Sequence, residues 1–98
     1  AKRADVAPEL PTISESGLHG FDVVSGYTIY APARTPRPII NRVNASINSV
    51  LQQPEVKERF MVLGVTPIIS TPESLTAYLK SEISRWGQII KEMNIKPE

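Results

Sequence analysis

Very few side chains in this sequence could act in acid–base or nucleophilic chemistry. The chain has 98 residues, with His19 as its single histidine and no cysteine. Thiol catalysis, disulfides and zinc–cysteine sites are therefore excluded, and a catalytic triad or a histidine-based metal site would depend on His19 alone. Because His19 lies between Leu18 and Gly20, an exposed loop position is the simpler interpretation. The sequence predicts no enzyme activity, no metal site and no cofactor.

The charged residues form no recognisable active site either. No glycine-rich phosphate loop, HExxH sequence or nucleophile elbow occurs. The chain carries 11 Lys and Arg against 10 Asp and Glu, a formal net charge of +1, whereas a nucleic-acid-binding domain shows a basic stripe. Arg34, Arg37 and Arg42 fall close together and could form a phosphate site, but a solvated helix start more often explains such a group. We expect no nucleic-acid partner.

Length and composition indicate one small globular unit. Apolar residues make up 41% of the chain and charged residues 21%, which is ordinary usage for a folded domain. No apolar run approaches the roughly 20 residues that a membrane-spanning helix needs, and no export signal opens the chain. Residues 1–11 contain Pro8 and Pro11 and little apolar content, so we expect a connector from a missing upstream region. Residues 12–98 would form the folded portion.

Two stretches have the composition of strands. Residues 21–31 are rich in β-branched and aromatic residues on both parities, which predicts a long strand covered on both faces, with a bend at Gly26. Residues 65–70 predict a short strand, which Pro67 confines to a sheet edge. Before them, Thr12 and Glu15 have the spacing of a capping box, and Gly17 would end the helical turn that it starts.

Three helices follow from apolar spacing and from proline positions. Thr35 and Pro36 predict an N-cap and a first helical residue, and Thr71 and Pro72 repeat that arrangement before a longer helix. A middle helix would start at Pro54 and close at Gly64, and Asn94 is a plausible left-handed stop for the last helix. The apolar stripes predict a buried core, with Trp86 anchoring the last helix to the strand layer. The predicted core residues are Ile40, Val43, Ile47, Phe60, Leu79, Ile83, Trp86 and Ile90.

The predicted fold class is α/β, with three main helices, one long strand and one short strand. Two strands cannot make a stable sheet alone, so the chain is expected to be an incomplete part of a larger fold.

Four segments of the chain resemble sequence motifs of one protein family, in the same order. Residues 10–21 (Leu-Pro-Thr-Ile-Ser-Glu-Ser-Gly-Leu-His-Gly-Phe) resemble its P-T-x-x-E-x-G-x-x-G-F/Y pattern, and residues 30–36 resemble F-A-P-A-G-T-P. Residues 63–67 with 70–73 are similar to L-G-x-x-P followed by S-T-P-E-E, and residues 82–87 to E-I-x-K-W-G. The family is that of the solute-binding proteins of tripartite tricarboxylate transporters (TctC), also called the Bug family. The resemblance spans nearly the whole chain, but only the C-terminal third of such proteins.

The resemblance implies part of one lobe of a two-lobed periplasmic-binding-protein fold, of the type II-like kind. Such a protein closes on a small carboxylated solute in the periplasm and delivers it to the membrane components of the transporter. The main ligand-binding loops of the family lie in earlier sequence. In this chain the strand region formed by Ser25, Gly26, Tyr27 and Thr28 is the candidate binding wall, which we expect to be insufficient to bind the solute alone.

The chain departs from the family pattern at two places, and a rival interpretation of its function stays open. Gly26-Tyr27 replaces the family's usual residues near the strand centre, and Arg34 stands where the family has glycine, which argues against a required positive φ there. The rival is a free-standing helical interaction or dimerisation module that uses the stripe from Leu75 to Met93. Sequence upstream of Ala1 would discriminate between the two. Unpaired strand edges also predict self-association of the chain, or pairing between its two strands.

Overall fold

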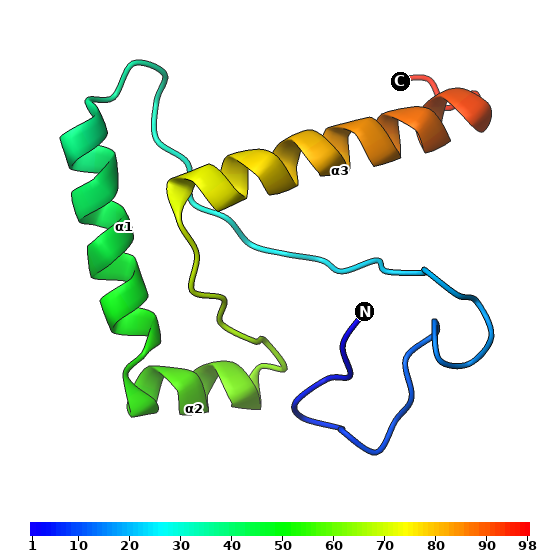
Figure 1. The fold of residues 1–98 in the computed structure, drawn as a ribbon, viewed down its shortest axis with the longest axis horizontal. Coiled ribbons are helices and arrows are strands. Elements are labelled where there is room, and N and C mark those ends of the chain that lie inside the picture. The colour runs from blue at the N-terminus through cyan, green and yellow to red at the C-terminus, as the bar shows by residue number, and fades with distance from the viewer.

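The structure is a computed structural model that describes all 98 residues, and it contains three helices and no strand. α1 spans Arg37–Leu51, α2 spans Pro54–Val62 and α3 spans Pro72–Glu92. α1 and α2 meet at a corner, and α3 starts beside α1 and extends away from it, as Figure 1 shows. The chain before α1 runs as an extended segment along α3. The three predicted helices are therefore confirmed, but the sheet is absent.

Both predicted strands are wrong for this structure. Residues 21–31 are extended but pair with no other segment, and residues 65–70 form an irregular connection between α2 and α3. The prediction that these two segments pair with each other is not met either. Strand-forming residues fit a pleated, half-covered surface, and no such surface exists here to receive them. Side chains of both parities are consequently exposed, including Val24 at 69% and Tyr27 at 94%.

α1 begins one residue later than predicted. Pro36 is the N-cap, with φ −55° and ψ 137°, and Arg37 is the first helical residue. Thr35, the expected cap, instead donates its hydroxyl hydrogen to the carbonyl of Pro32 at 2.7 Å. That hydroxyl serves the preceding turn and not the helix.

The turn before α1 requires a left-handed residue, contrary to the expectation for Arg34. Arg34 has φ 68°, and the Thr35 amide donates to the Pro32 carbonyl at 3.2 Å. A four-residue turn with positive φ at its third position is type II, where glycine is favoured. Arg34 therefore adopts the conformation that a glycine would adopt without strain.

Replacing Arg34 by glycine is expected to stabilise this turn. A non-glycine residue in the left-handed region costs about 1–2 kcal/mol, which glycine would avoid. Because glycine has more conformational entropy in the unfolded chain, about half of this stabilisation is lost again. We expect the protection factor of the Thr35 amide against hydrogen exchange to rise roughly two- to fivefold in Arg34→Gly. The neighbouring change Ala33→Gly is the control and should lower protection. Equal protection in Arg34→Gly and the parent chain would contradict the strain.

The remaining helix ends agree with their predicted chemistry. α2 starts at Pro54 after Gln53, and Gly64 follows it with φ 70°. α3 is capped by Thr71, whose Oγ1 accepts from the Ser74 amide at 3.1 Å. Ser74 returns the bond, since its Oγ accepts from the Thr71 amide at 3.0 Å, a reciprocal contact that the sequence analysis did not identify. Asn94 has φ 52° after the end of α3, as predicted for a left-handed stop.

The capping box near the N-terminus is also confirmed. The Glu15 carboxylate accepts from the Thr12 amide at 2.7 Å, and Thr12 Oγ1 accepts from the Glu15 amide at 3.1 Å. Arg3, in the predicted connector, donates to the same carboxylate at 2.9 Å. This hydrogen bond from Arg3, followed by the Thr12 amide, lowers the pKa of the Glu15 carboxyl. The stabilisation is therefore present above the ordinary pKa of a glutamate and is lost as the pH falls through the lowered pKa.

The predicted core does not form in this chain. No residue is buried, and the groove between α3 and α1 is lined only by the first turns of α3. Trp86 is 37% exposed and does not reach a strand layer. The predicted core residues are not buried because no layer covers the apolar faces of α1 and α3. Of the eight predicted core residues, Ile40, Ile47 and Phe60 are half-buried, whereas Val43, Leu79, Ile83, Trp86 and Ile90 are exposed.

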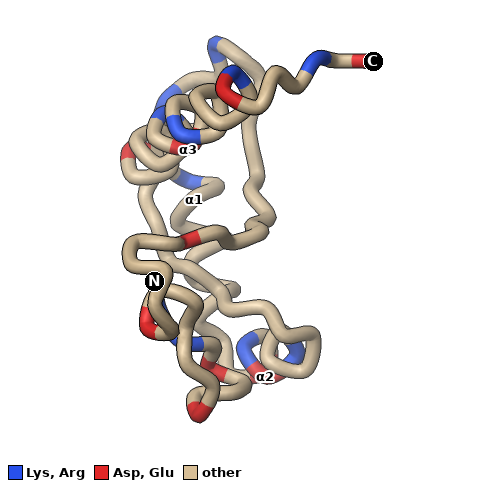
Figure 2. The backbone as a smooth tube through the Cα atoms, turned by 90° about the vertical axis from the view of Figure 1, so that its right-hand side faces the viewer, with Lys and Arg blue, Asp and Glu red and all other residues tan.

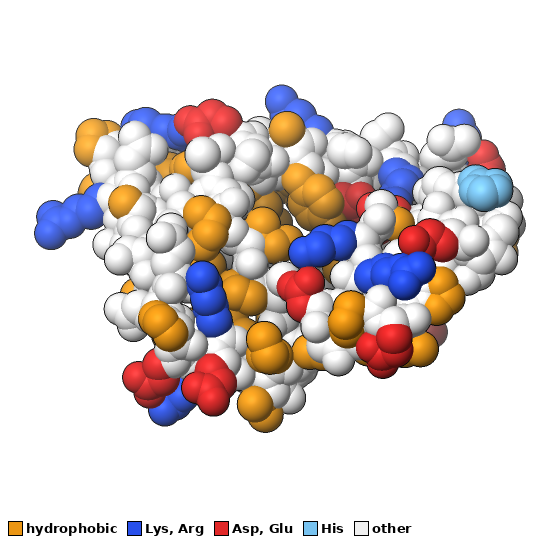
Figure 3. Space-filling view, turned by 60° about the horizontal axis from the view of Figure 1, so that its bottom comes forward, with side chains coloured by type: hydrophobic (Ala, Val, Ile, Leu, Met, Phe, Trp, Pro, Cys, Tyr) orange, Lys and Arg blue, Asp and Glu red, His pale blue; other side chains and the backbone are white.

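The overall dimensions agree with this open arrangement. The radius of gyration is 16.7 Å, against about 13 Å for a compact domain of about 100 residues. The surface measures 8635 Å², whereas a globular monomer of this mass exposes about 5,500 Å². Hydrophobic side chains are spread over the face shown in Figure 3, between the charged ones. Roughly 3,000 Å² of surface therefore remains available for covering.

Candidate functional site

The four predicted binding residues lie in the middle of the extended segment. Ser25, Gly26, Tyr27 and Thr28 are all exposed, and none of them makes a hydrogen bond. Between Asp22 and Ala31 the only hydrogen bond is the one that the Asp22 carbonyl accepts from Arg85 of α3. In the structure, the predicted wall is therefore an exposed strip whose backbone amides make no hydrogen bond within the chain.

A groove between α1, α3 and the end of the extended segment is the larger of two described hollows. We call it the α1–α3 groove; its volume is about 350 Å³. Its apolar lining suits a hydrophobic layer better than a small acid, because a carboxylate needs several polar partners. The only charged lining residue, Arg37, is paired with Glu73. The apolar lining consists of Ile29, Tyr30, Ala31, Ile39, Ile40, Val43, Ile47, Pro72, Leu75 and Leu79.

One end of this groove is held by two asparagines that the sequence analysis overlooked. Asn44 and Asn48, one turn apart on α1, donate to the Ser70 carbonyl at 3.0 and 2.8 Å. Asn48 also donates to the Asn44 side chain at 3.3 Å. Because Ser70 precedes the N-cap of α3, these bonds fix where α3 starts relative to α1. The four-residue spacing was visible in the sequence, but their partner lies 22 residues beyond Asn48.

The helix N-termini next to the groove have few free amides for an anion. In the first turn of α1, Pro38 has no N–H, and the Ile39 amide already donates to the Pro36 carbonyl at 3.0 Å. In α3, Pro72 also lacks an N–H, and the Ser74 amide is capped by Thr71. Each helix start thus retains at most one or two of the donors that a carboxylate-binding terminus offers.

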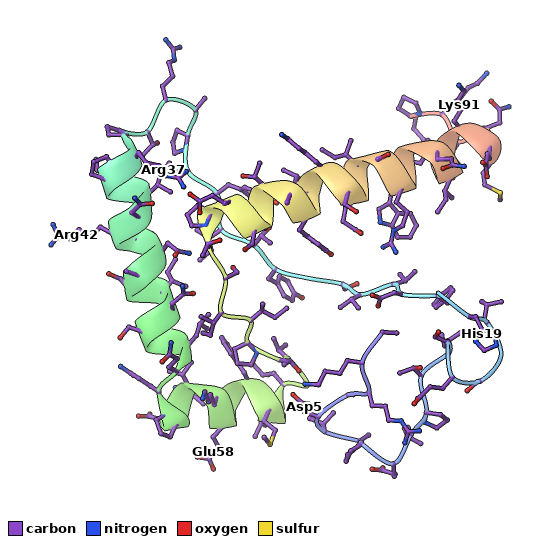
Figure 4. The ribbon with its side chains drawn as sticks, in the orientation of Figure 1. Asp5, His19, Arg37, Arg42, Glu58 and Lys91 are labelled. Atoms are coloured by element: carbon purple, nitrogen blue, oxygen red, sulfur yellow. The ribbon has the colours of Figure 1, made fainter.

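The other candidate residues are also dispersed. Figure 4 shows His19 in the turns at the far side from α1, and it shows Arg37 and Arg42 pointing to different sides of α1. The three arginines therefore do not converge on one phosphate position. In Figure 2, Lys and Arg and Asp and Glu are scattered along the trace between long uncharged stretches. No group of three metal-binding side chains occurs, and none of the helices is both long and apolar enough to span a bilayer.

Comparison with known protein families shows which family the chain belongs to. Residues 1–95 match the TctC family, described as the tripartite tricarboxylate transporter family receptor. The chain belongs to the TctC family. The motif resemblance is thereby confirmed, and the prediction of no enzyme activity agrees with a family of receptors. The receptors of this family are periplasmic.

Curated relatives agree with the family match. The chain is 40% identical over 89 residues to a UPF0065 protein in the tcbD-tcbE intergenic region of a Pseudomonas species. It is 36% identical over 93 residues to a UPF0065 protein of Agrobacterium vitis, and 35% identical over 89 residues to protein BugT of Bordetella pertussis. The alignments cover 90 to 92% of this TctC-family chain but only 26 to 27% of each relative. No solved structure matches the chain.

Proposed function

We propose that the chain is the C-terminal portion of an extracytoplasmic solute receptor for a tripartite tricarboxylate-type transporter. Residues 1–11 would connect it to the preceding sequence, and residues 12–98 would complete one lobe of a two-lobed, type II-like fold. The receptor would capture a small carboxylate in the periplasm and deliver it to the membrane components of the transporter. The observation that carries this proposal is the family match over residues 1–95.

The uncovered surface supports a larger parent fold. The excess of roughly 3,000 Å² over a compact monomer is as large as the area buried in obligate protein interfaces. The apolar residues involved lie on α1, on α3 and on both sides of the extended segment, where a sheet and its covering helices would pack. Covering these faces would bury the predicted core residues that are now exposed.

The proposed ligand wall is the strip formed by Ser25, Gly26, Tyr27 and Thr28. Three hydroxyls, those of Ser25, Tyr27 and Thr28, and a run of unpaired backbone amides are the groups that can donate to a carboxylate. In the chain alone these donors face water, so each hydrogen bond contributes only about 1 kcal/mol net. That is too little to hold a small acid below about millimolar concentration.

A titration with small carboxylates tests the ligand part of the proposal. We expect citrate, succinate, glutamate and nicotinate to produce no saturable backbone amide shifts in the 98-residue chain at micromolar concentration. Saturable shifts clustered on residues 25–28 at those concentrations would contradict the claim that the opposite lobe is needed. A ligand signal elsewhere in the chain would contradict the choice of wall.

The reading frame that encodes the chain tests the receptor itself. We expect it to continue upstream of Ala1 with an export signal and with the strands of two lobes, to about three and a half times the present length, as the coverage of the relatives implies. A frame that starts near Ala1 without such a signal would contradict the receptor and favour the interaction module.

A further inference from the structure

One contact joins the proposed ligand wall to α3 across most of the sequence. Arg85 Nη1 donates to the carbonyl oxygen of Asp22 at 2.5 Å, and the two residues are 63 positions apart. Asp22 lies three positions before Ser25. No other hydrogen bond holds residues 22–31, so this contact is the one hydrogen bond between the start of the wall and α3. The Asp22 carboxylate also lies 3.7 Å from the amino group of Ala1.

Arg85 is itself held by its neighbours on α3. Its Nη2 donates to Glu82 Oε2 at 3.0 Å, and the indole Nε1 of Trp86 donates to the same oxygen at 2.8 Å. The Arg85 guanidinium also lies over the Trp86 ring, 5.2 Å from its centroid. Because these residues are three and four positions apart, one helical face brings them together. We call them the 82–86 cluster.

The cluster has the features of a fixed group, in contrast to the exposed ion pairs elsewhere. The Glu82 side chain is 21% exposed and that of Arg85 is 37% exposed, whereas Arg59 and Glu55 on α2 are 77% and 78% exposed. The Arg85 Nε atom is covered and has no hydrogen-bond partner. Its side chain therefore leaves one donor unsatisfied while another reaches Asp22, which indicates an orientation set by the cluster and not by solvent.

We propose that the 82–86 cluster is a positioning site for the ligand wall. Glu82 and Trp86 orient the Arg85 guanidinium, Arg85 holds the Asp22 carbonyl, and Asp22 sets the path of Ser25 to Thr28 along α3. This role rests on the proposed function, because the wall it positions is the wall assigned there. Arg85 acts through the backbone of Asp22 and does not itself touch the solute.

Distance measurements by electron spin resonance test the positioning without any ligand. The chain has no cysteine, so Thr28→Cys with Ser84→Cys supplies the only two labelling positions. In Arg85→Ala we expect the distance distribution between the labels to broaden by about twofold, since the segment is then free to open locally. Arg85→Lys keeps a cationic donor and should remain closer to the parent width, and Glu82→Gln should broaden the distribution to an intermediate extent.

Arg59→Ala is the matched control, because it removes an ion pair within a helix without touching the extended segment. Equal widths in Arg85→Ala and Arg59→Ala, or no rescue by Arg85→Lys, would overturn the proposal. Far-UV circular dichroism checks that α3 persists. If Arg85→Ala loses helix content, Glu82→Gln is used in its place. A distance distribution in Glu82→Gln that is as narrow as in the parent chain then overturns the proposal as well. Because no solute is added, this result is separate from whether the receptor binds a carboxylate.

Discussion

The 98-residue chain is expected to associate with itself as its concentration rises. None of its residues is buried, and the extended segment has unpaired edges on both sides. Exposed apolar faces and open strand edges both recruit further chains. In sedimentation equilibrium we expect the average mass to rise from 10.8 kDa at about 10 μM to at least roughly twice that value at about 1 mM.

A pair of variants on α3 separates apolar association from a charge effect. Ile83 is 64% exposed, so Ile83→Lys removes apolar surface and should shift association to higher concentration. Ser84→Lys adds the same charge next to it without removing apolar surface, and it should have a much smaller effect. A strictly monomeric chain at about 1 mM, with no slow hydrogen exchange in residues 21–31, would contradict this prediction.

At low concentration the chain is expected to unfold over a broad range instead of in a sharp transition. Cooperativity, the urea m-value and the heat-capacity change all depend on how much surface folding buries. With roughly 3,000 Å² left uncovered, the heat-capacity change should fall well below the 1.2–1.5 kcal/mol/K usual for about 100 residues. Thermal and urea unfolding followed by circular dichroism at about 10 μM would measure this.

Two further results are expected from the same open structure. The chain should bind a hydrophobic dye in buffer, as states with exposed apolar surface do. Trp86→Ala should have a much smaller effect than the roughly 3–5 kcal/mol expected for a core tryptophan, because Trp86 is 37% exposed. A steep two-state transition with the m-value of a compact domain would contradict the open structure.

The helices could be predicted from sequence because their signals are local. Proline at a first helical position, a threonine N-cap and a left-handed asparagine each act within one turn, so α2 and α3 begin and end where those residues indicate. The Thr12–Glu15 capping box was predictable for the same reason. Even the one-residue error at Thr35 arose locally, when its hydroxyl bonded to the turn before it.

The sequence by itself also determined the family, because ordered motifs along the chain suffice for that comparison. Tertiary structure alone decided the rest. Strand composition in residues 21–31 became an unpaired segment because a ladder needs a second chain segment at the right place. Arg34 took a positive φ because the Pro32 to Thr35 turn imposes it. The link from Arg85 to Asp22 joins residues 63 positions apart, and contacts at such separation depend on how the chain is arranged in space, which no local pattern encodes.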